Sequence, residues 1–436
     1  MYDLVNAGVL VLENLDLARE KLDFAAIYFI SNNAASISRV IKDFSDKKPQ
    51  YPNVHLFFTG TVSSAHMKMI GAAKGLVSRL KTFEEINVDF IANESHLFTF
   101  GQTPSMLKNL YSNERDILAA ELQKASSQLV SVLLTLKEFP YIRYAKNGIC
   151  KGFADFVEAD MKQKISQLKT WESSPGRDRG TLLILDRSID PVAPIMHEYT
   201  YQAMCNDLLK IRGELCTLPD DVKPESKEDG DDLLVLSEDD NLWQEFRHKH
   251  IGFVLSEVTS KFKEFQQTNN MAKLQGSKQG DNANVKDMIA AMKDMTTYKD
   301  SMRKYQKHMA VAEACMNKFD KKMLKELGEL EQDMATGCTD EGNTTQAKDI
   351  KQQLVRMIGA KEVGVLDRLR LLMVYLASQG AIQESTRKEL LRGIDVRLQT
   401  AITNMTKLGV DLATKKSNQL KHSKETMKEN KIRAQT

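Results

Sequence analysis

The sequence predicts α/β domains joined to a large, mostly helical domain, on the strength of three observations. Short apolar runs alternate with helix-patterned stretches over the first 90 residues, as in α/β folds. The apolar run Leu182–Leu185 leads into Asp186, which indicates a buried strand of a parallel sheet, because such strands are apolar on both faces. Beyond residue 240, apolar residues recur at three- and four-residue spacing, which is the pattern of amphipathic helices.

The composition is that of a soluble globular protein of two to four domains. Its 436 residues are 42% hydrophobic and 28% charged. The 61 basic and 59 acidic residues leave a net charge of +2, so no global field favours nucleic acid as a partner. Five cysteines are scattered without a CxxC pair, which suggests reduced thiols in the cytosol.

The apolar runs predict neither a membrane span nor a signal peptide. None approaches the roughly 18 to 20 residues of a spanning helix. Asp3, Glu13 and Asp16 interrupt any apolar core of a signal peptide near the N-terminus. If the protein works at a membrane, we therefore expect a partner to bring it there.

The first 205 residues are expected to alternate strand and helix around parallel sheets with covering helices. The pattern predicts strands at 8–12, 24–30, 54–58, 86–91 and 182–185, and helices at 37–44, 63–81, 114–137 and 148–169.

Residues 217–241 are strongly acidic, and we expect a solvated loop that contains a short strand at 233–236. Asp239 or Asp240 is placed to cap the next helix, because its side chain can accept from the free amides of the first turn. That helix carries an apolar stripe from Leu242 to Phe265. His248 and His250 lie two residues apart and do not share a helix face, which argues against a metal site.

A heptad pattern is the most informative physical feature of the helical part. Its apolar residues step alternately by four and three, which predicts a seam that packs against another helix. The intramolecular candidates for that partner are the helices expected at 285–295 and 361–378. The alternative is a seam partly offered to an outside helix, which methionine favours because its flexible side chain repacks on different partners. The seam residues are Tyr298, Met302, Tyr305, Met309, Ala312, Met316, Phe319 and Met323.

Two carboxylates flank an arginine after the strand at 182–185, which raises the question of catalysis. We expect instead a structural clamp, in which Arg187 bridges Asp186 and Asp190, because charges in a half-buried loop must be paired. Neither a Ser-His nor a Cys-His partner stands beside them. The chain contains no GxxxxGK[ST], GxSxG or HExxH motif, and no GxGxxG after a strand.

The same region resembles the SM proteins, the syntaxin-binding family of vesicle fusion. The resemblance rests on LLILDRSIDPVAPIMHEYTYQAMCNDLL at 182–209 and EDDNLWQEFRHKHI at 238–251. INVDFIANES at 86–95 and Tyr141–Tyr144 after a KEFP run agree with it. The match extends over nearly the whole chain and fits the exocytic, plasma-membrane branch best.

The resemblance implies an arch-shaped, multi-domain protein. We expect α/β domains at 1–89 and 90–205, a mostly helical domain at 206–414 with a helical hairpin around 285–330, and a basic linker or tail at 415–436. Family members carry a further strand and helix before the position of Met1, and a C-terminal segment that completes the second domain. The chain is therefore expected to be truncated at both ends.

By the same resemblance the function is binding, with no catalysis and no cofactor. The implied partners are a syntaxin-type SNARE, the assembled SNARE complex and a vesicle SNARE. The resemblance also implies that the protein itself is a monomer. It implies a cytoplasmic protein, peripheral at the plasma membrane through syntaxin. The alternatives are an endosomal or vacuolar tethering subunit of the same family, and a metal-dependent α/β hydrolase that uses Asp186 or Asp190.

The resemblance to the SM proteins also assigns individual binding residues in this sequence. Glu13 and Glu20 fall where family members direct carboxylates to syntaxin in a central cleft, while Leu17 replaces a usual basic residue. Phe83 and Glu85 fall at an outer pocket for the syntaxin N-terminal peptide, with Met67 or Met69 lining it. The other interpretation of Phe83 is ordinary packing.

The vesicle-SNARE hairpin is assigned to Met295, Thr296, Thr297 and Met302. Relatives commonly hold a proline at this turn, which blocks continuation of a helix, whereas threonine only weakens it. We therefore expect the hairpin tip to extend into a helix more easily here.

Overall fold

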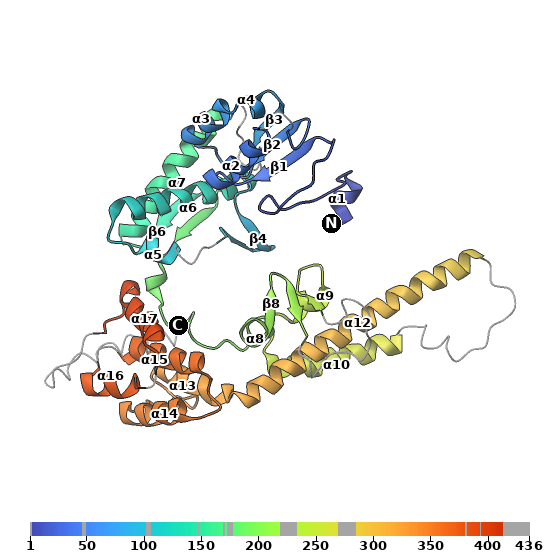
Figure 1. Cartoon of the computed structure of the whole chain (residues 1–436). Coiled ribbons are helices and arrows are strands. Elements are labelled where there is room, and N and C mark those ends of the chain that lie inside the picture. Colours follow the sequence, from blue (N-terminus) through green and yellow to red (C-terminus); the bar gives the residue numbers. More distant parts are fainter. Residues whose placement is uncertain are drawn as a thin grey trace. The chain divides into compact units, whose positions relative to one another are not determined.

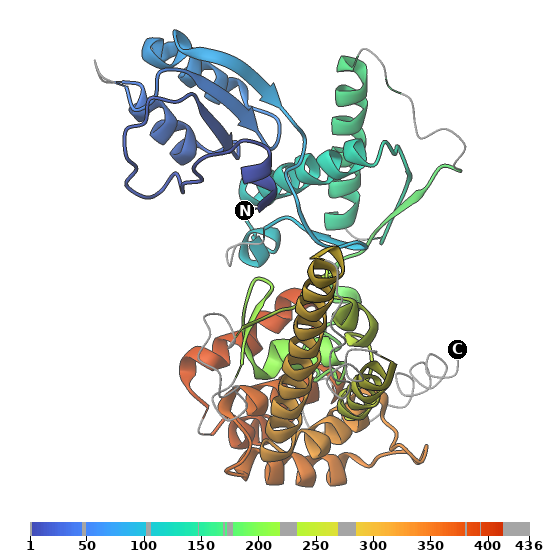
Figure 2. The same ribbon diagram turned by 90° about the vertical axis from the view of Figure 1, so that its right-hand side faces the viewer.

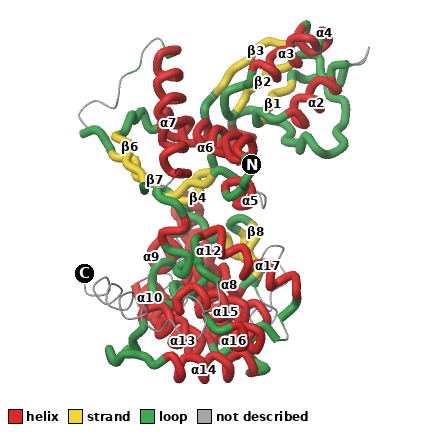
Figure 3. Tube along the Cα trace, turned by 90° about the vertical axis from the view of Figure 1, so that its left-hand side faces the viewer, coloured by secondary structure: helices red, strands yellow, loops and turns green. Residues whose placement is uncertain are grey.

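The protein is described from a computed structural model, in which contacts divide the chain into two compact units, Met1–Asp186 and Arg187–Thr436. Figure 3 shows that the first unit combines strands with helices, whereas the second is mostly helix. Side chains are not described at 2–3, 268 and 285–296. The residues described are 2–45, 49–101, 106–146, 148–168, 171, 178–218, 233–268, 285–379, 382–392 and 394–412.

A three-stranded parallel sheet, in the order β1-β2-β3, organises the first part of the first unit. Inward residues of the strands pack with residues of the crossover helices, such as Val54 and Phe58 with Ile37 and Phe44 (Figure 1). The elements are α1 Tyr2–Asn6, β1 Ala26–Ile30, α2 Ala34–Asp43, β2 Val54–Phe58, α3 Ser64–Ala72, α4 Lys74–Val77 and β3 Leu80–Glu85.

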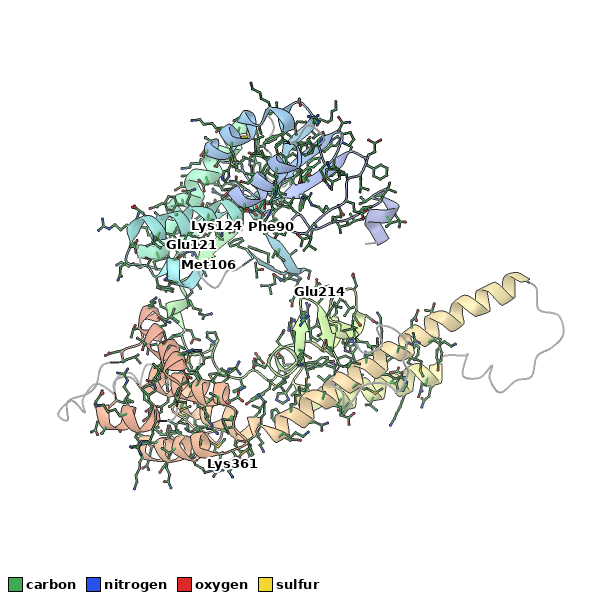
Figure 4. The ribbon with its side chains drawn as sticks, viewed as in Figure 1. Phe90, Met106, Glu121, Lys124, Glu214 and Lys361 are labelled. Atoms are coloured by element: carbon green, nitrogen blue, oxygen red, sulfur yellow. The ribbon has the colours of Figure 1, made fainter. Side chains whose placement is uncertain are left out.

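A second parallel pair, β6 with β7, is covered on one face by two long helices, α6 and α7. Asn109 of α5 donates to Glu121 of α6 over 2.8 Å. Figure 4 labels Met106 and Glu121 on these two helices. The elements are β4 Ile91–Glu94, β5 Leu97–Thr99, α5 Met106–Leu110, α6 Arg115–Thr135, β6 Tyr141–Tyr144, α7 Gly148–Gln167 and β7 Thr181–Ile184.

Two expected strands of the first unit are wrong. Residues 8–12 form no strand, because Gly8 turns the chain with φ 85° and Leu10 and Leu12 stay 74% and 61% exposed. The strand expected at 86–91 lies earlier, at β3, because the preceding helix ends at Val77. Asn87, with φ 51°, then turns the chain away from the sheet.

The second unit holds one large apolar core, built mostly from helices (Figure 2). A small antiparallel sheet, in the order β10-β9-β8, packs into it. The elements are η1 Arg187–Ile189, α8 Tyr201–Leu208, β8 Lys210–Arg212, β9 Leu215–Thr217, β10 Leu233–Val235, α9 Asn241–Phe246, α10 Ile251–Thr268, α12 Val285–Lys321, α13 Leu324–Thr336, α14 Ala347–Gly359, α15 Val365–Gln379, α16 Glu384–Leu390, α17 Val396–Asn404 and η2 Met405–Leu408.

The expected cap and short strand of the second unit are confirmed. Asp240 accepts from the amides of Leu242 and Trp243, at 2.9 and 3.3 Å, and β10 covers three of the four residues expected. The single helix expected to follow is wrong, since it divides into α9 and α10 at 247–250, where His250 forms a β-bridge with Thr200. Most of the acidic loop and the basic tail lie outside the described residues.

The residue ranges expected for the domains stay predictions, although residues 187–205 group with the helical unit. Among the described residues, no helix has the length and apolar content required to cross a bilayer. That part of the chain also contains no cluster of three or more His, Cys, Asp and Glu side chains able to hold a metal ion.

Candidate functional site

Helix α12 runs without a break through Thr296 and Thr297, where a proline would have interrupted it. The helix expected at 285–295 is therefore the first part of α12 itself and does not fold back on the heptad seam, so that candidate partner is wrong. The other candidate, α15, packs against α13 instead.

The partner of the seam is α10, which lies alongside α12 in Figures 1 and 2. The Phe265 ring stacks on Tyr298, with centroids 5.3 Å apart and planes at 14°. Tyr305 contacts Phe265 and Phe262 with centroids at 5.4 and 5.6 Å. The intramolecular interpretation of the seam is thus confirmed here, with an unexpected helix as partner.

Burial along α12 changes abruptly at one residue. None of the residues from Thr297 to Lys307 is buried, although Tyr298, Met302 and Tyr305 are half-buried. From His308 onward some side chains are fully buried, since His308, Val311, Ala312, Ala314 and Cys315 are each at most 1% exposed, while Met309, Met316 and Phe319 stay half-buried against the core. We call residues 285–307 the arm and residues 308–321 the root.

A buried polar chain fixes the point where the root begins. The hydroxyl oxygen of Tyr201 lies 3.0 Å from Nδ1 of His308, and Nε2 of His308 lies 3.3 Å from Oδ2 of Asp240. If Tyr201 donates to Nδ1, the remaining ring N–H donates to the carboxylate and every group is satisfied. Burial alone would raise the pKa of Asp240, but His308 and the charge of Lys304 lower it.

Two lysine side chains also attach α12 to neighbouring elements, one before and one after His308. Lys307 donates to the carbonyl of Leu233 in β10, and Lys318 donates to the carbonyl of Leu208 in α8, each over 2.8 Å. The last residue of the arm is therefore tied to the sheet and the root is tied to α8, while the aromatic contacts of the arm are with α10. The described seam residues of the arm, Tyr298, Met302 and Tyr305, are therefore covered only in part, while the start of the root is anchored.

The predicted hairpin residues all lie on the arm. Thr297 is exposed and its carbonyl accepts from the Ser301 hydroxyl, while Met302 is half-buried. Met295 and Thr296 belong to α12, but their side chains lie outside those described. Their role in binding stays a prediction.

The predicted outer pocket falls on β3 and α3 of the first unit. Phe83 packs its ring against Phe58, with centroids 5.5 Å apart, which favours ordinary packing. Glu85 accepts from the amide of Val62 at 2.8 Å and pairs with Lys164 at 3.2 Å. Met67 is 46% exposed on α3, so it is the most accessible of the three predicted pocket residues. Met69, the alternative to Met67, packs half-buried against the core.

The two predicted cleft carboxylates, Glu13 and Glu20, are both exposed. Glu13 accepts from the Tyr51 hydroxyl at 3.2 Å, and the carbonyl of Glu20 accepts from Gln50 at 2.6 Å. Leu17, which stands at a usually basic position, is 67% exposed.

A nearby arginine does not replace the missing basic residue. Arg19 forms a two-pronged ion pair with Asp43, at 2.9 and 3.1 Å, and Tyr28 donates to the same carboxylate over 2.6 Å. This guanidinium is therefore used inside the first unit and its charge is already paired.

The clamp expected around Arg187 needs correction. Arg187 donates to the backbone carbonyl of Asp190 at 2.9 Å, not to its carboxylate. The Asp190 carboxylate instead accepts from the amides of Val192 and Ala193, both at 3.0 Å. In the first unit, Asp186 accepts from the Tyr111 hydroxyl at 2.9 Å. The proline-rich turn satisfies Asp190 locally, because Val192 and Ala193 bring free amides within reach.

Comparison with known proteins decides the family. The model of the Sec1 family matches residues 1–436. The chain belongs to the Sec1 family. This confirms the resemblance drawn from the sequence motifs.

Two curated members of the Sec1 family are 34% and 28% identical to this chain over the aligned residues. "Protein transport protein sec1" of Dictyostelium discoideum is 34% identical over 417 residues, which cover 94% of this chain and 67% of the relative. The "SNARE-interacting protein KEULE" of Arabidopsis thaliana is 28% identical, over 96% of this chain and 63% of the relative. The chain thus spans about two thirds of the length of these two relatives.

Solved structures of Sec1 family type share the fold. The Unc18 protein in the Unc18-syntaxin 1 complex from Monosiga brevicollis superposes with a TM-score of 0.78 and 27% identity, covering 97% of this chain and 74% of that one. Vps45 in complex with the Qa SNARE Tlg2 superposes with a TM-score of 0.74 at 22% identity, over 93% and 70% of the two chains. The combined α/β and helical fold class is thereby confirmed.

The sequence did not reveal α10 as the partner of the seam. Phe262 and Phe265 belong to the apolar stripe of the preceding helix, at the spacing that matches the seam of α12. Pairing two stripes of equal period across the polar stretch at 266–284 would have found the contact.

Proposed function

We propose that this Sec1 family chain is a SNARE-binding regulator of vesicle docking and membrane fusion in exocytosis. The single observation that carries the proposal is the arm, an apolar helix seam that α10 covers only in part. Helix-in-groove binding uses such i, i+3, i+4 and i+7 anchors, and no bond is made or broken in it.

The proposal assigns a different partner to each surface. The arm takes a vesicle-SNARE helix beside Met302 and Thr297, where half-buried and exposed positions alternate. The exposed Glu13 and Glu20 meet basic groups of a syntaxin-type SNARE, and Met67 lines the pocket for its N-terminal peptide. Exposed carboxylates of this kind set association rate and register more than affinity.

The proposed setting is the cytoplasmic face of the plasma membrane, which the protein reaches as a monomer through syntaxin. The names of the two relatives, a protein transport protein and a SNARE-interacting protein, support a role in vesicle traffic. The syntaxin bound by the Unc18 protein of Monosiga supports the choice of partner. Regulation by binding, without catalysis, is part of the same proposal.

Calorimetric titration with the cytoplasmic part of a plasma-membrane syntaxin, with and without its N-terminal peptide, tests the proposal. We expect binding that weakens at least tenfold when the peptide is removed. The variant Met67→Glu should lose the same increment, because it places a charge in the pocket. Ala65→Glu, on the same helix and also exposed, is the matched control and should bind as the parent does. Absence of any binding would refute the syntaxin assignment.

An endosomal role within the same family is the second candidate. "Vacuolar protein sorting-associated protein 45" of Dictyostelium discoideum is 25% identical to this chain over 386 residues, which favours considering it. Parallel titrations with an endosomal and a plasma-membrane syntaxin separate the two. At least tenfold tighter binding of the endosomal protein would replace the exocytic proposal.

A further inference from the structure

The chain segment that opens the second unit contacts helix α13 near its end, at His197 and Tyr199. We call residues 187–200 the connector. The Tyr199 hydroxyl donates to the carbonyl of Leu324 at 2.7 Å. Its ring fills the space over Gly328, where a Cβ would lie 1.7 Å from the hydroxyl oxygen. One turn further on, the amide of His197 donates to Glu331 at 2.8 Å. Tyr199 and His197 thus attach the connector along α13.

His197 also brings together charged groups from three parts of the second unit. Its Nδ1 lies 2.8 Å from Oε1 of Glu331 on α13, and its Nε2 lies 3.4 Å from Oδ1 of Asp367 on α15. Lys322, between α12 and α13, donates to the other oxygen of Asp367 at 3.2 Å. The His197, Glu331 and Asp367 side chains are 1%, 0% and 7% exposed.

This geometry favours the charged form of the imidazole. Ionised carboxylates only accept hydrogen bonds, and a neutral imidazole carries one ring N–H. With both ring nitrogens facing carboxylates, only the imidazolium can donate to Glu331 and Asp367 together. The imidazolium and Lys322, whose side chain is 39% exposed, then balance the two carboxylates, as buried charges require.

The surrounding charges favour the proton on His197. Burial alone would lower the pKa of His197, but the hydrogen bonds to Asp367 and Glu331 raise it to about 9. Arg370 on α15 opposes this increase, but its guanidinium is held by Asp207 at 2.9 Å. His197 in turn lowers the pKa of Asp367 below its ordinary value.

We propose that His197 is a buried proton-binding site, and that its proton latches the connector onto α13 and α15. Loss of this proton leaves a ring nitrogen facing a carboxylate and weakens the attachment of residues 187–200. The proposal concerns only the second unit and does not depend on SNARE binding.

The pH dependence follows from the direction of the pKa shift. The folded protein binds this proton more tightly than the unfolded chain, whose histidine titrates near 6.5. The latch therefore contributes its full stability below about pH 6.5. That contribution is lost as the pH rises through about 9.

Histidine ring NMR of the whole chain tests the protonation state directly. With His197→Asn used for assignment, we expect the His197 ring to be protonated at pH 7.5 and to titrate with a midpoint above 8. The variant Glu331→Gln removes one acceptor charge and should lower that midpoint by at least one pH unit. A midpoint at or below 6.5 in the parent chain would overturn the proposal.

Hydrogen exchange tests whether the proton holds the connector. In His197→Asn at pH 7.5, we expect amides at 195–201 to exchange at least tenfold faster than in the parent, while amides of α10 keep their rates. Unchanged exchange at 195–201 would contradict a latch. Equal acceleration throughout the second unit would show that His197 supports general stability and would also overturn the proposal.

Discussion

The arm and the root of α12 share one heptad pattern but have different environments. In the root, Val311, Cys315 and the seam residue Ala312 are fully buried, and the half-buried seam residues Met309 and Phe319 pack against the same core. In the arm, Tyr298 and Tyr305 contact the aromatic rings of α10 and remain half-buried, although Tyr305 also touches the edge of the core. The spacing of apolar residues along a helix therefore predicts that an apolar seam exists. The elements packed around that seam decide how much of it stays accessible to a binding partner.

The largest expected effect places the same charge on each half of α12. Val311→Asp buries an unpaired carboxylate in the root and should cost about 4 kcal/mol of the free energy of unfolding, measured by urea denaturation. Met302→Asp, in the half-exposed arm, should cost less than about 1 kcal/mol. Similar losses for both variants would remove the distinction between arm and root.

The second prediction concerns the helix that follows the root. Gly328→Ala should cost about 3 kcal/mol, because its Cβ would lie 1.7 Å from the Tyr199 hydroxyl and force the connector off α13. Gly359→Ala, where nothing lies within 4 Å, is the matched control and should leave the unfolding midpoint unchanged or slightly raised. A tolerated Gly328→Ala would contradict the close approach of Tyr199.

The third prediction tests the polar chain at the start of the root. Asp240→Asn preserves an N-cap but loses the charged acceptor of His308, and should cost about 2 kcal/mol at pH 7. The pKa of Asp240 is lowered in the folded protein, so its stabilisation is present above pH 4 and is lost as the pH falls through the folded pKa. Unfolding curves of parent and variant should therefore converge in acid. A difference that stays constant with pH would contradict the charge interaction.

The smallest expected effect lies in the arm itself. Phe265→Ala removes the stack on Tyr298 and should weaken the pairing of α10 with the arm by about 1 kcal/mol. It should appear as faster hydrogen exchange at 297–305, with little change in the global unfolding midpoint. Gln267→Ala, exposed on the same helix, is the control. A large drop in the global midpoint would mean that the arm is part of the folding core.

Short sequence patterns correctly predicted several strands, helices and a helix cap, because these features depend on residues close together in the sequence. The strand at 54–58 and the helix at 115–135 follow from alternation and helical spacing, and Asp240 follows from capping chemistry. The strand predicted at 8–12 is wrong, because an apolar run alone does not indicate whether a neighbouring strand is present to pair with it. Leu10 and Leu12 are largely exposed.

The candidate site was predictable only in part, because its decisive contacts are distant in sequence. The seam was visible, but its pairing with α10 bridges the polar stretch at 266–284. His197 could be seen within a motif, yet its acceptors Glu331 and Asp367 lie 134 and 170 residues away. No local pattern states which carboxylates will surround a buried histidine.

Affinity for a vesicle-SNARE helix, measured with and without a proline in the arm, tests the central claim most directly. Proline at 296 removes an amide donor and clashes with the carbonyl four residues earlier, which interrupts the arm and leaves the root intact. By fluorescence anisotropy with a labelled peptide of that helix, Thr296→Pro should bind at least tenfold more weakly than the parent, and Thr296→Ala should stay within about twofold. Equal affinity of the parent and Thr296→Pro would contradict the arm as the binding surface.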